Sequence, residues 1–195
     1  MRDDIILCGV GGQGTVLASR LLSDAAVAAG EPVRAAETIG MAQRGGSVTS
    51  HVRIGLGPHS PLIGYGEASV LIGFEPAEAA RQLAYLAPDG TAVVATRPVV
   101  PASALTGGPA YDLGAVMDFL ESCAARLVLV DVDEAASELG TAKATNVVLL
   151  GAAASSGALS CGDAALRDAI ARRVPERFLD LNMRALELGL AAGRA

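Results

Sequence analysis

Hydrophobic residues follow two patterns along this chain: short unbroken runs, and longer stretches in which they recur every three or four positions. Short apolar runs next to glycine or polar residues are typical of strands buried on both faces. Such runs occupy residues 5–8, 70–72, 92–95 and 127–130, and residues 32–36 are a further strand candidate. The helical repeat predicts helices over residues 17–28, 112–125, 146–154 and 179–190. Because strands and helices mostly alternate, we predict an α/β class with a mainly parallel sheet.

Local signals mark several helix ends. Pro76 suits the first turn of a helix, where its fixed φ matches the helix and its missing N–H is not needed. Asp131 or Asp133 predicts the start of a short helix that ends near Gly140. Asp163 predicts the cap of another helix, which stops before a proline.

The composition fits a single domain over residues 1–195, since domains usually run to about 100–200 residues. The chain is 51% hydrophobic but only 3% aromatic, lacks Trp and carries a formal net charge of −6. Its apolar content excludes disorder, and its acidic, aromatic-poor character argues against a nucleic-acid reader. The longest uncharged stretch, residues 144–162, contains several polar residues and glycines. It therefore predicts a buried helix and a turn rather than a membrane span.

The three cysteines, Cys8, Cys123 and Cys161, lie far apart in the sequence. Their odd number and spacing do not fit a disulfide framework or an iron–sulfur site. The two histidines, His51 and His59, have no metal-ligand spacing. We therefore expect a reducing, cytoplasmic compartment with no export signal, and neither a metal site nor a catalytic triad in this chain.

Residues 9–15, Gly-Val-Gly-Gly-Gln-Gly-Thr, match the pattern G-x-G-x-x-G between a predicted strand and a predicted helix. Glycines allow a tight turn and let a ligand approach backbone N–H groups, while the helix N-terminus favours an anion. Thr15 stands where a phosphate-binding P-loop needs lysine. For a dinucleotide ligand, Glu37 at the end of the second strand would be the acid that binds a ribose hydroxyl. The alternative is a turn required only for packing.

A second glycine-containing loop, residues 43–47, precedes a strand over residues 48–54. Adjacent glycines can form an anion-binding nest, and Arg44 could bind a carboxylate or phosphate through two nitrogens. The strand alternates strictly, so His51 and Arg53 share one face. We expect this loop and face to form a site or a subunit contact. The alternative is an ordinary turn with a solvated arginine.

Several segments together resemble one protein family. They are residues 9–14 (GVGGQG) and residues 40–55 (GMAQRGGSVTSHVRIG), with further matches at Gly73-Phe74-Glu75-Pro76, Asn146 and Asn182. The chain is identified as a member of the gamma-subunit family of 2-oxoacid:ferredoxin oxidoreductases. Its closest resemblance is to the small (beta) subunit of indolepyruvate ferredoxin oxidoreductase. The resemblance spans nearly the whole chain, and the second segment is the most specific.

The resemblance implies a Rossmann-like three-layer fold in a subunit that is not active alone. Such complexes convert a 2-oxoacid and coenzyme A to an acyl-CoA and carbon dioxide, and pass electrons to ferredoxin. It implies that thiamine diphosphate and the iron–sulfur clusters are held by a large partner subunit, with no cofactor bound by this chain alone. We expect no contact with nucleic acid or membrane. The isolated chain could form homo-oligomers through surface that its partner would cover, and the sequence leaves this alternative open.

The predicted site contacts a ligand or the partner, and contains no catalytic residue and no metal ligand. It comprises Gly9, Gly11, Gly12, Gln13, Gly14 and Thr15 of the first loop, Gln43, Arg44, Gly45, Gly46 and Ser47 of the second, and His51, Arg53 and Glu75. The resemblance implies that Arg44 contacts either coenzyme A or a partner carboxylate. Three alternatives stay open: the gamma subunit of a pyruvate or 2-oxoglutarate ferredoxin oxidoreductase, a free-standing dinucleotide-binding protein, and a scaffold whose loops only pack against a partner.

Overall fold

The structure is a computed structural model that describes residues 2–39, 45–55, 60–101, 104, 107–108 and 110–194. Its strands are β1 (Asp3–Val10), β2 (Val33–Ile39), β3 (Ser47–Ile54), β4 (Ala68–Gly73), β5 (Leu86–Ala95) and β6 (Arg126–Val130). They form a sheet in the order β2-β3-β1-β4-β5-β6. Strands β1, β4, β5 and β6 pair in parallel, whereas β3 pairs antiparallel with both β1 and β2. The sheet is therefore mainly parallel, as the sequence predicts.

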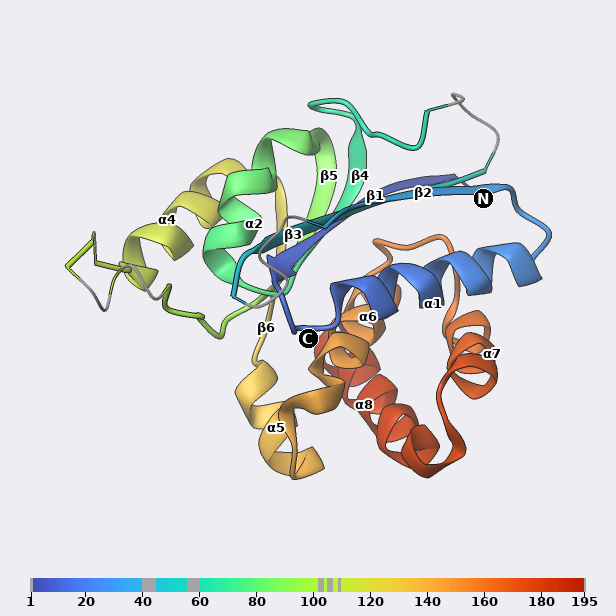
Figure 1. Cartoon of the computed structure of the whole chain (residues 1–195). Helices are drawn as coiled ribbons and strands as arrows, with labels where there is room; N and C mark the ends of the chain where they lie inside the picture. Colours follow the sequence, from blue (N-terminus) through green and yellow to red (C-terminus); the bar gives the residue numbers. More distant parts are fainter. Residues whose placement is uncertain are drawn as a thin grey trace.

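Helices cover both faces of this sheet and complete three layers (Figure 1). On one face lie α1 (Thr15–Ala28), α5 (Val132–Leu139), α6 (Thr145–Ser155), α7 (Asp163–Arg173) and α8 (Leu179–Ala192), and on the other lie α2 (Pro76–Gln82) and α4 (Leu113–Cys123). Short 3₁₀ turns form η1 (Leu83–Tyr85), η2 (Ala142–Ala144) and η3 (Glu176–Phe178). This arrangement confirms the predicted three-layer α/β class. Within the described ranges, no helix has the length and apolar character to span a bilayer.

The apolar runs of the sequence become strands with two buried faces. In β1, Ile5 and Leu7 point into the core that includes α1 and α6, while Ile6 and Cys8 point into the core that includes α2 and α4. All eight residues of β1 are buried. Burying a large apolar side chain stabilises a fold by roughly 1.5–3 kcal/mol. The central strand is thus anchored from both sides, and the loop that follows it starts from a rigid position.

The strand order differs from the strand–helix–strand unit that the N-terminal sequence indicates. Strand β2 runs parallel to β1 but is not its neighbour, because β3 lies between them. Only residues 40–46 connect β2 to β3, too few for the helical crossover that a parallel neighbour requires. The antiparallel pairing places Ser47 opposite Val10 and Ile54 opposite Asp3. The start of β3 therefore lies beside the end of β1.

Capping aspartates and one proline define where several helices begin. Asp131 caps α5 by accepting from two backbone N–H groups of its first turn, each at 3.0 Å. Asp112 caps α4 in the same way with one bond of 3.0 Å. Pro76 opens α2 as predicted. Asp163, predicted as a cap, is instead the first residue of α7, and Gly162 holds the cap position.

Helices α6 and α8 pack with their backbones in contact, and glycines make this approach possible. A Cβ added at Gly189 of α8 would lie 2.0 Å from the carbonyl oxygen of Val148 in α6. A Cβ at Gly151 of α6 would lie 2.6 Å from the carbonyl oxygen of Leu186. Because the crowded atoms belong to the backbone, they cannot rotate aside. The glycines thus set the distance between the two helices, and with it the position of α6 beneath the sheet.

We expect Gly189→Ala to lower the free energy of unfolding by about 1–3 kcal/mol, because the new methyl group would collide with the backbone of α6. Thermal denaturation should show a fall in Tm of about 2–4 °C for each kcal/mol lost in a chain of this size. Gly114→Ala is the matched control, since the nearest atom to its Cβ is Asp112 Oδ1 at 3.4 Å. This control should be neutral or slightly stabilising, because Ala favours helix over Gly. Equal Tm values for both variants would contradict the close packing.

Candidate functional site

The carboxyl ends of the parallel strands form an edge at which the direction of the chain switches between β1 and β4. From β1 the chain leaves through α1 on one face, and from β4 it leaves through α2 on the other. Open α/β sheets bind ligands in the crevice at such a switch point. A cleft of about 500 Å³ lies there and is termed the glycine-loop cleft. Its walls include Gly12, Gly14, Phe74, Arg97, Lys143 and Asn146.

The glycine loop needs its glycines for the turn and for packing within the chain. Gly12 and Gly14 have φ angles of +104° and +84°, which residues with a Cβ rarely adopt. Gly14 is also the N-cap of α1, and a Cβ there would lie 2.7 Å from Asn146 Nδ2. A Cβ at Gly9 would lie 2.8 Å from that of Phe74. These close approaches bring β4 and α6 against the loop.

Gln13 ties the glycine loop to the neighbouring strand. Its Oε1 accepts from the N–H of Val10 at 2.7 Å, and its Nε2 donates to the carbonyl oxygen of Phe74 at 2.9 Å. Both ends of the side-chain amide are therefore engaged within the chain. Thr15, the next predicted site residue, begins α1 and is buried. Gln13 lines the glycine-loop cleft, whereas Thr15 is not among its lining residues.

The two predicted loops lie directly against each other. The N–H of Gly11 donates to the carbonyl oxygen of Gly46 at 2.8 Å. The hydroxyl of Ser47 donates to a buried carboxylate of α2 at 2.6 Å. Gln43 and Arg44 lie outside the described residues, so their predicted contacts stay predictions. The structure thus brings the described parts of both loops together at one edge of the sheet.

Besides Thr145, three polar side chains that line the glycine-loop cleft are absent from the predicted site. Asn146 is 3% exposed, and its Nδ2 donates to the carbonyl oxygen of Gly14 at 3.4 Å while its Oδ1 has no partner in the described structure. Arg97 follows β5, and its guanidinium lies 3.3 Å from the carboxylate of Asp133. Lys143 lies in η2, beside the start of α6. All three come from parts of the chain distant from the glycine loop.

Weak signals for two of these residues are present in the sequence. Lys143 is the only lysine among 195 residues, and a lone cation of this type near a predicted buried helix is unusual. Asn146 is a polar residue at the start of an otherwise apolar helix. Arg97 carries no comparable signal, because arginines are frequent in this chain.

The cleft suits an anionic ligand that also offers a hydrogen-bond donor. Arg97 and Lys143 supply positive charge, and the N-terminus of α1 adds N–H groups and a partial positive charge. A buried acceptor without a partner, such as Asn146 Oδ1, costs about 1–3 kcal/mol. A ligand hydroxyl or amide N–H at that oxygen would remove this cost. The arrangement therefore favours a molecule that combines phosphate or carboxylate groups with hydroxyl or amide groups.

A second cleft, of about 490 Å³, lies on the α2 side of the same edge and is termed the α2 cleft. Its walls include Gly45, Ser47 and the first turn of α2. Two glutamates of that turn, Glu75 and Glu78, are 1% and 6% exposed. Glu75 caps α2 by accepting from the N–H of Glu78 at 2.9 Å. Glu75, predicted to contact a ligand or partner, is thus turned into the protein.

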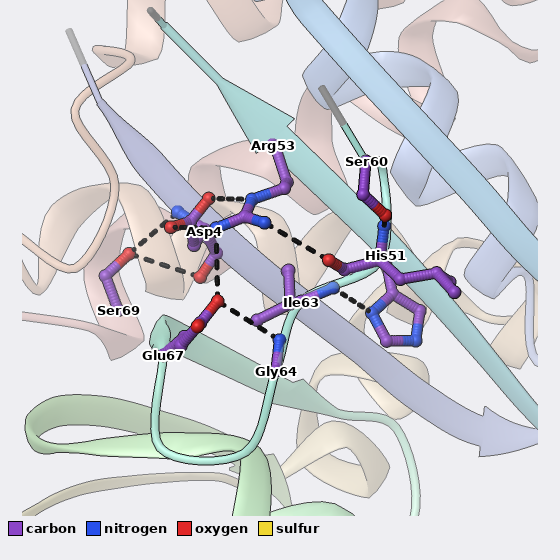
Figure 2. A network of polar contacts seen from close by, with 9 residues as sticks. Asp4, His51, Arg53, Ser60, Ile63, Gly64, Glu67 and Ser69 are labelled. Atoms are coloured by element: carbon purple, nitrogen blue, oxygen red, sulfur yellow. Dashed lines mark hydrogen bonds and ion pairs between the residues drawn. The ribbon is translucent and has the colours of Figure 1, made fainter. Parts of the chain in front are cut away.

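His51 and Arg53 share the predicted face of β3 (Figure 2). His51 stands opposite Ile6 in the middle of β1, and Arg53 lies toward the end of the strand far from the glycine loop. Arg53 stands opposite Asp4 at the start of β1, six residues beyond Ser47. Six residues of a strand span about 20 Å. The alternation of β3 is therefore confirmed, whereas Arg53 and the second loop do not form one cluster.

Arg53 anchors the connection before β4 to the sheet (Figure 2). Its Nε and a terminal nitrogen donate to the two carboxylate oxygens of Asp4 at 2.7 and 3.1 Å, and it also donates to the carbonyl oxygen of Leu62 at 3.1 Å. The hydrogen bond and charge of Asp4 raise the pKa of Arg53. The N–H of Ile63 donates to Nδ1 of His51 at 3.2 Å. These two predicted site residues therefore hold the segment 60–67 in place.

Glu37 does not have the surroundings of a ribose-binding acid. It lies in β2, which β3 separates from β1, and its carboxylate accepts from the hydroxyl of Ser19 in α1 at 3.2 Å. In dinucleotide-binding folds the acid ends the strand beside β1. The geometry therefore argues against the dinucleotide-binding alternative.

The described cysteines and carboxylates do not form an iron–sulfur or metal site. Cys8 and Cys161 are buried and Cys123 is exposed, each on a different part of the fold. No group of three or more His, Cys, Asp or Glu side chains in the described ranges could hold a metal ion. An iron–sulfur cluster therefore has no set of thiolate ligands among these residues.

The fold and cleft define a Rossmann-like α/β domain with a cleft at its switch point. A sequence profile described as pyruvate ferredoxin/flavodoxin oxidoreductase matches residues 4–192. Indolepyruvate oxidoreductase subunit IorB from Archaeoglobus fulgidus is 39% identical over 190 residues, covering 97% of this chain and 94% of that protein.

Two solved structures share this fold. The gamma subunit of keto/oxoacid ferredoxin oxidoreductase from Geobacter sulfurreducens has a TM-score of 0.70 at 25% identity, covering 99% of this chain and 97% of that chain. The 2-oxoglutarate:ferredoxin oxidoreductase from Magnetococcus marinus, solved with 2-oxoglutarate, coenzyme A and succinyl-CoA, has a TM-score of 0.73 at 18% identity. The second match covers 99% of this chain but 31% of the longer one, and it shows the fold alone.

The chain belongs to the pyruvate ferredoxin/flavodoxin oxidoreductase family. Its homologues are subunits of 2-oxoacid oxidoreductase complexes. The family indicated by the glycine loop and by residues 40–55 is thereby confirmed.

We expect Gly14→Ala to destabilise the chain more than Gly12→Ala. Both substitutions force a Cβ into a positive φ, which costs about 1–2 kcal/mol. Only at Gly14 does the new Cβ meet a neighbour, Asn146, whereas nothing lies within 4 Å at Gly12. Thermal denaturation should therefore show the larger fall in Tm for Gly14→Ala. Equal losses would mean that Asn146 moves aside and does not hold the loop.

Lowering the pH should loosen segment 60–67 through His51. Burial, with the charge of Arg53, lowers the pKa of His51 below its ordinary value of about 6.5. In the unfolded chain this histidine takes up a proton as the pH falls through about 6.5, but in the folded chain only at lower pH. The stability that neutral His51 contributes is therefore complete above about pH 6.5 and declines below it.

His51→Asn is the matched variant for this test, because an amide oxygen can accept the Ile63 N–H without titrating. Between about pH 7.5 and about pH 5.5, the wild type should lose more Tm than His51→Asn. Parallel pH profiles of Tm would show that protonation of His51 does not weaken the fold.

Proposed function

We propose that this chain is the small subunit of a 2-oxoacid ferredoxin oxidoreductase of the indolepyruvate type. The complex oxidatively decarboxylates indolepyruvate or a related aryl pyruvate with coenzyme A, giving acyl-CoA, carbon dioxide and two electrons that reduce ferredoxin. The observation that carries this proposal is the similarity, over nearly the whole length of both chains, to a relative named as an indolepyruvate oxidoreductase subunit. In this proposal the chain works in the cytoplasm and is inactive alone.

Thiamine diphosphate and the iron–sulfur clusters are assigned in this proposal to a large partner subunit. Thiamine diphosphate supplies the decarboxylation chemistry, and the clusters carry the electrons to ferredoxin. The three cysteines support this division, because two are buried and the third lies apart from them on the surface of the chain. The role of this chain is then to complete the structure of the complex and to contact the coenzyme.

The glycine-loop cleft supports a direct contact with coenzyme A. Arg97 and Lys143 would face its phosphates, and Asn146 Oδ1 would accept from one of its hydroxyl or amide groups. A volume of about 500 Å³ lies within the usual range of about 300–1,000 Å³ for ligand pockets. The contact between Gly11 and Gly46 also places the second loop nearby. Arg44 is therefore proposed to contact either the coenzyme or the partner from that loop.

The alternatives differ in what they expect of the purified proteins. A pyruvate or 2-oxoglutarate enzyme would use the same subunit with a different 2-oxoacid. A free-standing dinucleotide-binding protein would bind a nucleotide without a partner, but the position of Glu37 opposes it. A scaffold role would leave coenzyme dependence untouched by changes in the cleft.

The proposal is tested with the chain purified together with its large subunit, by reduction of a viologen dye. The panel contains indolepyruvate, phenylpyruvate, pyruvate and 2-oxoglutarate, each with coenzyme A. We expect activity only in the complex, with an aryl pyruvate preferred. Preference for pyruvate or 2-oxoglutarate would instead assign the complex to the enzymes that use that 2-oxoacid. Inactivity of the complex, with saturable nucleotide binding by the chain alone, would favour the dinucleotide-binding alternative.

We expect Lys143→Ala to raise the KM for coenzyme A about tenfold and to leave kcat nearly unchanged. Loss of a hydrogen bond to a charged group costs about 1.5 kcal/mol or more, and 1.4 kcal/mol corresponds to a factor of ten. Arg172→Ala removes an exposed cation of α7 that does not line this cleft, and serves as the control. Equal KM values for the two variants would overturn the coenzyme contact and favour the scaffold role.

A further inference from the structure

One carboxylate oxygen of α2's cap residue bonds two positions that lie apart in the sequence. Oε1 of Glu75 accepts both from the N–H of Val99 at 3.3 Å and from the hydroxyl of Tyr111 at 2.5 Å. The other oxygen accepts from the N–H of Glu78 and so caps α2. Val99 and Tyr111 stand twelve positions apart in the sequence. Glu75 therefore joins the two ends of the segment 99–111 to each other and to the first turn of α2.

Residues 97–101, which include Val99, form the wall between the two clefts and are termed the 97–101 wall. Arg97, Pro98 and Val99 line the glycine-loop cleft, while Val99, Val100 and Pro101 line the α2 cleft. The backbone of Val99, which Glu75 holds, thus borders both. Arg97, the cation proposed to face the coenzyme, stands only two residues before it. The position of Arg97 accordingly depends on how firmly Val99 is held.

Glu75 can hold this wall because its carboxylate is buried with its partners. It is 1% exposed, and a buried carboxylate is tolerated only when hydrogen-bond donors surround it. Breaking the hydrogen bonds from Val99 and Tyr111 would leave a desolvated carboxylate, which is costly in free energy. The bonds therefore stabilise the position of the wall. Burial, followed by the hydrogen bond and charge of Glu75, raises the pKa of Tyr111 well above its usual range. The tyrosine therefore stays protonated and remains a donor.

We infer that Glu75 is a positioning residue: through Val99 and Tyr111 it holds the 97–101 wall and thereby sets Arg97 for the coenzyme. Its link to the coenzyme rests on the proposed function, whereas its hold on the wall does not. Glu75 acts through the backbone and does not itself touch the ligand. Its removal should loosen the wall and raise the KM for coenzyme A, without lowering kcat at saturation.

Two variants separate the wall from the helix cap. Glu75→Gln removes the charge and one acceptor oxygen, whereas Tyr111→Phe removes one donor and leaves the α2 cap intact. Should Glu75→Gln fail to fold, Tyr111→Phe still tests the inference. Glu78→Gln is the control for the wall, since that neighbouring buried carboxylate bonds Ser47 and Arg81 instead.

The first readout is amide hydrogen exchange at Val99 and Val100 in the folded chain. We expect exchange about tenfold faster in Glu75→Gln, faster by a smaller factor in Tyr111→Phe, and unchanged in Glu78→Gln. In Glu75→Gln the pKa of Tyr111 should also fall toward its ordinary value of about 10, as followed by tyrosinate absorbance. Unchanged exchange at Val99 in both folded test variants would overturn the inference.

The second readout is viologen reduction by the complex at varied coenzyme A. We expect a rise of about tenfold in KM for Glu75→Gln, a smaller rise for Tyr111→Phe, and a kcat within about twofold of wild type. The positioning role is overturned by the following combination of results. Exchange at Val99 rises in the test variants and Lys143→Ala raises the KM for coenzyme A, but Glu75→Gln and Tyr111→Phe leave that KM unchanged. If Lys143→Ala also leaves the KM unchanged, the proposed coenzyme contact has failed, and exchange alone decides whether Glu75 holds the wall.

Discussion

The insertion of β3 between β1 and β2 is the constraint on which the rest of this structure depends. Because β3 pairs antiparallel along the whole of β1, Ser47 lies beside Val10 and the two glycine loops meet. The same register carries Arg53 to Asp4 at the far end of the strand. A slip of one residue would exchange the two faces of β3 and turn its apolar side chains out of the core. A single register thus joins the two loops at one edge of the sheet and forms the Arg53–Asp4 anchor at the other end.

The elements of this fold could be predicted because their signals are local. Apolar runs mark the buried strands, and Asp131 and Pro76 mark helix starts within a few residues. The strand order could not be predicted in the same way, since it depends on β3 pairing with two strands that are separate in the sequence. The short connection over residues 40–46 is the local sign of an antiparallel return, and the strand–helix–strand pattern obscures it.

The sequence was sufficient to predict the glycines of the candidate site, but not its cations Arg97 and Lys143. The spacing of the glycine loop indicates a turn at a helix N-terminus, and the structure has one there. Asn146 reaches this loop from 132 residues away, at the start of α6, a helix that packs closely against α8 at Gly151 and Gly189. Arg53 and Glu75 were predicted to contact a ligand or partner, but their side chains point inward. There they form hydrogen bonds that hold segments of the chain together.

The unequal exposure of the three thiols offers a way to locate this chain within an assembly. Burial, with the charges of Glu78 and Glu75, raises the pKa of Cys8, and burial raises that of Cys161 to about 11. Both thiols therefore stay protonated and shielded at neutral pH. Cys123, at the end of α4, is exposed. A maleimide reagent would consequently attach at one position, where a fluorophore or spin label could report the distance from α4 to a second label on a partner protein.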